Sequence, residues 1–76
     1  MIKFKIDVQK ELKAKGYTSY VLQKKNYLSG TALKHLRNNE LTDMGALNAI
    51  CCMLRMPPEK IIDFEITDDE KIKYFI

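Results

Sequence analysis

The sequence has no tryptophan and few of the residues that build metal sites or disulfides. It has one histidine and two cysteines, Cys51 and Cys52, which are adjacent. A zinc site needs several ligands, usually in spaced pairs, and neighbouring helical residues point about 100° apart, which disfavours a disulfide. We therefore expect no metal and no cofactor, with Cys51 as a small core residue and Cys52 as a partly exposed thiol.

Long apolar runs are also missing. No stretch of the sequence approaches the roughly 18 apolar residues that a membrane span requires, and the alternating start, MIKFKID, is unlike the apolar core of a signal peptide. We expect a cytoplasmic protein with no membrane partner. A glycine-rich phosphate loop, a carboxylate pair and a nucleophile beside a base are missing too, so we expect neither an enzyme nor a small-molecule substrate.

The composition that is present indicates one small globular domain with an uneven charge. The chain has 76 residues, of which 46% are apolar. Residues 1–40 carry nine Lys or Arg against three acids, a net charge of +6, whereas residues 41–76 carry four against seven, a net charge of −3. A basic N-terminal half suits a polyanionic partner.

Apolar periodicity predicts a mainly α protein with a strand near each end. Residues 2–6 (IKFKI) and 63–67 (DFEIT) alternate, and we expect them to pair as a two-stranded antiparallel β ribbon, with Phe64 and Ile66 on one side. Between them the spacing predicts five helices, at residues 8–15, 19–26, 30–38, 43–54 and 58–62. The apolar stripe of the fourth comprises Met44, Leu47, Ile50, Cys51 and Leu54.

Polar residues mark the predicted helix boundaries. The expected N-caps are Asp7, Thr18, Ser29 and Thr42. Gly16 is expected to end the first helix and Asn38-Asn39 the third, because glycine and asparagine tolerate left-handed backbone conformations.

The second and third predicted helices are joined by about three residues, which indicates a helix-turn-helix. Their expected buried set is Leu22, Leu28, Leu33 and Leu36. On a helical wheel Thr31 and Asn38 point away from the leucines, and Lys34 and His35 flank them. Ser29 and Gly30 are short, so this end of the helix can approach DNA closely. Such a helix can present side chains to base edges and phosphates in the major groove.

Residues 2–66 resemble the Cro/phage-repressor-type helix-turn-helix domains of the lambda-repressor-like fold. The resemblance rests on ELKAKGYTSYVLQKKNYLSGTALKHLRNNELT and LNAICCMLRMPPEKIIDF. It implies a five-helix bundle that binds a double-stranded DNA operator as a homodimer and regulates transcription, and we expect repression. By position, Ser19 corresponds to a phosphate contact, Asn38 to a backbone contact, and the recognition positions are Ser29, Gly30, Thr31, Lys34 and His35. Arg37 can also reach phosphate or a base edge.

The sequence departs from the family pattern at three positions. Gln23 stands where alanine is common, Tyr27 where glycine is common in the turn, and Gly30 where relatives often place a base-reading glutamine. A tyrosine would be strained at positive φ, so we expect Asn26 to take the unusual conformation instead. The missing glutamine removes a bidentate adenine contact, worth about 1–3 kcal/mol of discrimination.

Several alternatives stay open at this point. His35 could be an exposed residue without a role, Lys24 and Lys25 could be solvated, and Tyr20 could pack across the helix pair or donate to a phosphate. We expect residues 1–66 to form the DNA-binding domain and residues 67–76 a tail.

The tail carries Ile72, Tyr74, Phe75 and Ile76. It could fold back onto the domain, and we expect it instead to bury against a second copy as a homodimer contact. The second functional hypothesis is a protein-interaction module, such as a regulatory or antitoxin-like subunit, motivated by Gly30, Tyr27 and this tail. The polar, basic outer face of residues 30–38 favours DNA.

Overall fold

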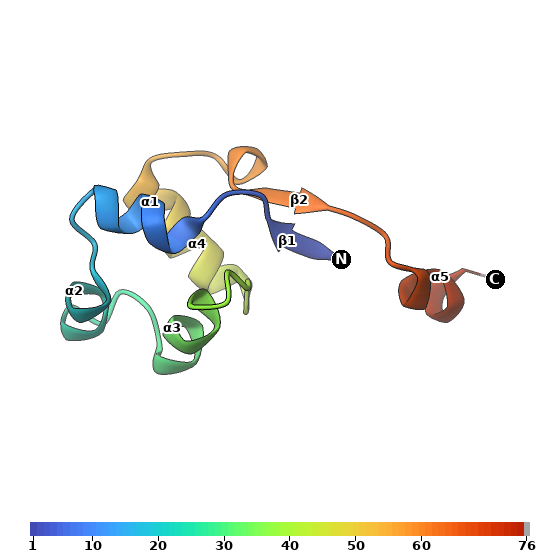
Figure 1. Ribbon diagram of the computed structural model, residues 1–76, viewed down its shortest axis with the longest axis horizontal. Coiled ribbons are helices and arrows are strands. Elements are labelled where there is room, and N and C mark those ends of the chain that lie inside the picture. The colour runs from blue at the N-terminus through green and yellow to red at the C-terminus, as the bar shows by residue number, and fades with distance from the viewer. Residues whose placement is uncertain (76) are drawn as a thin grey trace.

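A computed structural model describes residues 1–75; Ile76 lies outside the described residues. The predicted fold class is confirmed. The chain is mainly helical, and a two-stranded antiparallel ribbon pairs residues 2–4 with residues 62–64 (Figure 1). The elements are β1 (Ile2–Phe4), α1 (Val8–Ala14), α2 (Ser19–Lys24), α3 (Gly30–Leu36), α4 (Met44–Leu54), the 3-10 helix η1 (Pro58–Lys60), β2 (Ile62–Phe64) and α5 (Asp68–Tyr74).

Side-chain caps start the helices. Asp7, Thr18 and Ser29 each accept a hydrogen bond from the backbone N–H three residues later, at 3.1 to 3.3 Å, as predicted. The prediction for α4 is wrong by one residue: Asp43 is the N-cap and accepts from the Ala46 N–H at 2.7 Å. The carboxylate satisfies the first turn of α4, so the Thr42 hydroxyl is not needed there.

Left-handed residues end the first four helices. They are Gly16, Asn26, Asn39 and Arg55, with φ between 55° and 90°. In each case the next backbone N–H donates to the carbonyl five residues earlier, at 2.8 to 3.1 Å, which satisfies a carbonyl that would otherwise lack a partner. These turns make α1, α2 and α3 one or two residues shorter than predicted, because the last predicted residues form the caps.

The core lies between α1, α4 and the α2–α3 pair. Its twelve buried apolar residues are Phe4, Val8, Leu12, Leu22, Leu28, Ala32, Leu36, Ala46, Leu47, Ile50, Leu54 and Ile61. Three residues of the predicted α4 stripe are buried, namely Leu47, Ile50 and Leu54, and Cys51 is half-buried. It is wrong for Met44, which is 72% exposed. Met44 is the first residue of α4 and lies on its outer side, and Ala46 occupies the inward position instead.

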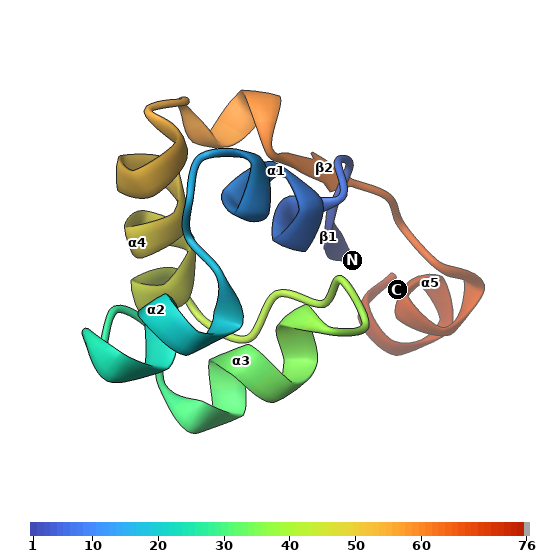
Figure 2. The ribbon, with the colours of Figure 1, turned by 60° about the vertical axis from the view of Figure 1, so that its left-hand side comes forward.

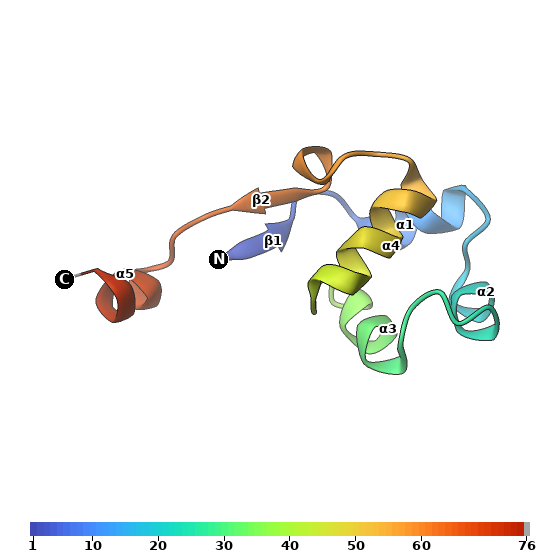
Figure 3. The same cartoon turned by 180° about the vertical axis from the view of Figure 1, so that it is seen from behind.

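The ribbon pairs three residues of each strand, in the register Ile2↔Phe64, Lys3↔Asp63 and Phe4↔Ile62. It is shorter than predicted. Phe64 and Ile66, which were expected on one side of the strand, are 65% and 40% exposed, and Ile66 lies beyond the end of β2. The ribbon extends past the helices and only its Phe4 end reaches the core (Figures 1 and 3).

The residues after β2 form a helix that the sequence analysis did not predict, and the predicted fifth helix at 58–62 is only the short η1. η1 begins at Pro58, and its single turn ends before β2 starts at Ile62, whereas the Thr67–Glu70 capping box starts α5. The Met1 ammonium lies 2.6 Å from the Glu70 carboxylate and holds the pKa of that carboxyl at about 2. Lys3 pairs with Glu65 and lowers the pKa of that carboxyl. The first of these exposed contacts joins the start of the chain to α5, and the second joins β1 to the segment between β2 and α5.

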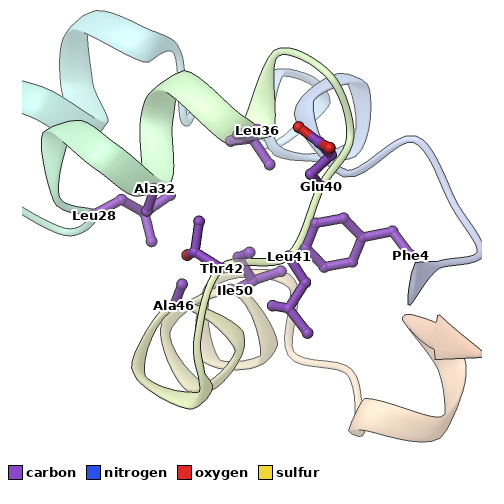
Figure 4. Close-up of a pocket in the computed structure, with 9 residues that line it drawn as sticks. All are labelled: Phe4, Leu28, Ala32, Leu36, Glu40, Leu41, Thr42, Ala46 and Ile50. Carbon is purple, nitrogen blue, oxygen red and sulfur yellow. The ribbon is translucent and has the colours of Figure 1, made fainter. Parts of the chain in front are cut away.

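A small apolar cavity of about 10 Å³ lies beneath α3, between that helix and α4 (Figure 4). The Thr42 side chain points into it toward Ala32 and Ala46, and its buried hydroxyl has no hydrogen-bond partner among the described residues. A water needs about 10–15 Å³ and two to four polar partners, and the lining here is almost entirely apolar. The hydroxyl of Thr42 is therefore a local cost to stability.

We predict that Thr42→Val raises the free energy of unfolding by about 1 kcal/mol, because a methyl group replaces a buried hydroxyl without a partner. Thr42→Ser is the matched control; it keeps the hydroxyl, loses a core methyl and should lower that free energy. Urea unfolding followed by circular dichroism measures both. A valine variant less stable than the native chain would contradict the prediction.

Candidate nucleic-acid interface

The α2–α3 pair packs against the core through one face of each helix. Leu22, Leu28 and Leu36 are buried as predicted. Leu33 is only partly buried, and Ala32 takes the inward position at 6% exposure. Ala32 and Leu36 are four residues apart, so they lie one above the other on the inner face and Leu33 is displaced to its side.

In the turn between α2 and α3, where the family commonly has a glycine, an asparagine takes the left-handed conformation. Asn26 has φ 56°, whereas Tyr27 does not have a positive φ, so the expected turn is confirmed. The Tyr27 N–H donates to the Leu22 carbonyl at 3.0 Å. The Tyr27 ring meets Tyr17 edge-on, with 6.3 Å between the ring centroids. Asparagine tolerates the left-handed conformation better than a bulky residue does.

The outward face of α3 is polar and open. Figure 2 shows α3 along the edge of the molecule, with α1 and α4 on its inner side. The predicted residues exposed on it and around its ends are Ser29, Gly30, Thr31, Lys34, Arg37 and Asn38. Ser29 also caps α3, so its hydroxyl is already partly engaged. The structure therefore brings six of the eight predicted residues together on one exposed surface.

The remaining two predicted residues have partners inside the protein. His35 is partly exposed, and its Nδ1 lies 3.3 Å from Glu40 Oε1, which leaves Nε2 available to a ligand. Ser19 is half-buried and accepts from Gln9 Nε2 at 3.4 Å. Both are still at the surface next to α3 and α2. Gln9 and Glu40 could not be predicted as partners of these residues, because no spacing pattern in the sequence marks either contact.

The outer face of α2 adds positive charge and an aromatic ring beside α3. Tyr20 is 68% exposed, so it does not pack across the helix pair. The Lys24 ammonium lies 5.5 Å from the Tyr20 ring centroid, a cation–π contact. Lys24 and Lys25 are both exposed.

Asn39 connects the end of α3 to the start of α1. Its Oδ1 accepts from the Val8 N–H at 3.1 Å, and its Nδ2 donates to the Ile6 carbonyl at 2.9 Å. The sequence analysis recognised Asn39 only as a helix stop. One side chain thus both ends α3 and satisfies backbone groups of a different element, which fixes α3 relative to α1.

The chemistry available at this surface is hydrogen bonding and ion pairing. Within residues 1–75 no group of three or more His, Cys, Asp or Glu side chains is placed to hold a metal ion. None of the helices in the same range is long and apolar enough to cross a membrane. Positive side chains with exposed amide and hydroxyl groups suit phosphates and base edges.

Most of the chain matches the model of a known family. Residues 7–68 match the Cro/C1-type HTH DNA-binding domain, a non-catalytic helix-turn-helix family. The matched range includes α1 to α4 and the whole surface described above. Searches of curated proteins and of solved structures found no match.

We predict that Asn39→Gly lowers the free energy of unfolding by about 1–2 kcal/mol, because it removes both side-chain hydrogen bonds while a glycine still accepts the positive φ. Asn26→Gly is the matched control, with nearly the same φ of 56° and an exposed side chain, and it should be neutral or slightly stabilising. Thermal and urea unfolding of the two variants measure the difference. Equal effects at both positions would mean that the bridge from Asn39 to α1 contributes nothing.

Proposed function

The chain belongs to the Cro/C1-type helix-turn-helix DNA-binding domains, and from this premise we propose that it is a sequence-specific transcriptional regulator, acting as a repressor. In this proposal α3 enters the major groove of a double-stranded operator, and occupancy of the site blocks the promoter. The observation that carries it is the outward face of α3, which is exposed, polar and basic on a helix held at both ends.

The residues divide into two roles in this proposal. Lys34 and Arg37 bind phosphates, which gives affinity that falls with salt. Thr31 contacts a thymine methyl or a base edge, and His35 Nε2 donates to or accepts from a base edge because Nδ1 is already held by Glu40. Ser19, Ser29 and Asn38 contact the DNA backbone and set the register.

Gly30 has a separate role in the proposal. A Cβ built at this position meets no atom within 4 Å, so nothing within the protein demands a glycine. Its φ is not positive either. The reason proposed here is that the DNA backbone or a base approaches α3 closely at this residue.

We propose that the DNA-binding domain, residues 1–66, works as a homodimer through the tail, residues 67–76. α5 has no buried residue, and Ile72, Tyr74 and Phe75 are 82%, 66% and 60% exposed. A two-fold dimer can present two α3 helices to half-sites one DNA turn apart, about 34 Å.

A protein-interaction module is the second candidate function. The exposed Tyr20, Tyr27 and tail favour it. The outward face of α3 carries polar residues where a protein-binding helix would have an apolar stripe, so we rank DNA binding first.

Two substitutions test the division of roles. His35→Ala should lose about 1–3 kcal/mol of discrimination at one base pair and leave binding to random duplex nearly unchanged. Lys34→Ala should weaken binding to all DNA and reduce the slope of log affinity against log salt by about 0.9. Fluorescence anisotropy across a salt series, after selection of preferred sites, measures both, with Lys60→Ala on η1 as the control. Native protein that binds no duplex at low salt would favour the protein-partner function.

A third substitution tests the role of Gly30. Gly30→Ala should raise the free energy of unfolding by about 0.5–1 kcal/mol, because alanine is the better helix former and the site is open. The same variant should bind operator DNA at least tenfold more weakly. A variant that is more stable and binds as tightly as the native protein would remove close approach as the reason for the glycine.

A further inference from the structure

The tail helix α5 buries no side chain against its own chain, although so short a helix needs a packing partner. α5 has seven residues, none of them buried, and isolated helices shorter than about 12–15 residues are marginal in water. Within residues 1–75 its one ion pair with the body joins the Met1 ammonium to the Glu70 carboxylate, at 2.6 Å, and this pair is exposed. On one side of α5 the residues follow in the order Asp68 and Asp69, then Ile72, then Phe75, at spacings of three and four. The first turn is acidic and apolar side chains follow it; Asp68 lies 4.0 Å from the Lys71 ammonium, whereas Asp69 has no ion pair among the described residues.

An apolar surface groove lies near the C-terminal ends of α1 and α4. It has a volume of about 300 Å³ and is lined by Tyr17, Tyr27, Ala49, Cys52 and Met53. This volume is at the lower end of those of protein pockets that hold organic ligands. The lining is mostly apolar, and the edge-on Tyr17–Tyr27 pair forms one wall.

A second hollow continues the groove and is basic. It is lined by Lys15, Tyr17, Met53 and Arg55, so it shares two residues with the first. The two hollows together give an apolar part next to a positively charged part. This is the order that would receive the apolar and acidic parts of α5.

The tail cannot reach this groove in its own chain. Figure 1 shows α5 at one end of the molecule and α2 with the adjoining ends of α1 and α4 at the other, and the longest extent is 46 Å. Three residues, 65–67, separate β2 from α5, and three extended residues span only about 10 Å. With β2 paired to β1, the occupant has to come from another chain.

We propose that the groove between Tyr17, Tyr27 and Met53 binds α5 of a second copy of this chain, with Ile72 and Phe75 in the apolar part and Asp68 or Asp69 beside Lys15 and Arg55. Two copies that lie antiparallel can exchange tails as a closed two-fold pair, because each has its tail and its groove at opposite ends. This rests on the proposed homodimer and names the surface that receives the tail. Tyr27 is also the turn residue between α2 and α3, so the tail of one copy supports the DNA-binding turn of the other.

The test uses the thiol that already lines the groove. One chain keeps Cys52; the other carries Tyr74→Cys with Cys52→Ser, which leaves Ile72 and Phe75 in place. The two are mixed and treated with a short bifunctional maleimide, and linked residues are identified by mass spectrometry. Cys51 is present in both chains, and burial raises the pKa of its thiol, which lowers its reactivity. We expect a cross-link between the tail of one chain and Cys52 of the other.

The matched control moves the acceptor thiol away from the groove. An acceptor chain with Cys52→Ser and Lys60→Cys on η1 should give at least tenfold less cross-link. Sedimentation of the native chain and of a chain lacking residues 71–76 runs in parallel. A dimer that dissociates on deletion but does not link to Cys52 would overturn the groove assignment alone. A native chain that sediments as a monomer, or a dimer that survives the deletion, would overturn the tail-mediated homodimer as well.

Discussion

The placement of α3 depends on the Asn39 side chain, which hydrogen-bonds backbone groups outside the helix. Its left-handed backbone ends the helix, and its amide bonds backbone groups of residues 6 and 8 on either side of the α1 N-cap. Leu36, one turn earlier, is buried in the core. A polar bridge and an apolar anchor at the same end of a seven-residue helix fix its direction, which the helix could not achieve by its own propensity.

Local hydrogen bonding at the helix ends also explains how so small a core can support the exposed polar surface of α3. A chain of this size buries only about 60% of its unfolded surface, so each helix end has to be satisfied locally. Side-chain caps at the starts and left-handed turns at the ends do this for α1 to α4. The inner face of α3 then contributes Ala32 and Leu36 to the core, with Leu33 packed partly against it, while Thr31 and Lys34 stay exposed.

The fold could be predicted because its signals are local. Alternating residues gave the ribbon, apolar spacing gave α1 to α4, and the turn at Asn26 followed from the need to avoid strain at Tyr27. The errors arose where tertiary contacts decide. Thr42 faces the core because Asp43 is the stronger cap, and the Asn39 bridge joins residues more than thirty positions apart, which no periodicity encodes. The surface of α3 was predictable from a helical wheel, whereas the Glu40 and Gln9 contacts required coordinates.

We propose that the protein meets DNA through the outward face of α3 rather than through the tail or the groove. An NMR titration of the ¹⁵N-labelled chain with a short duplex can locate the contact, because each backbone amide gives its own signal. We expect the largest shift changes at residues 29–38 and at the start of α2, which diminish as salt is added, with small changes at residues 49–53. Shift changes concentrated at residues 49–53 and 68–75, with α3 unaffected, would contradict it.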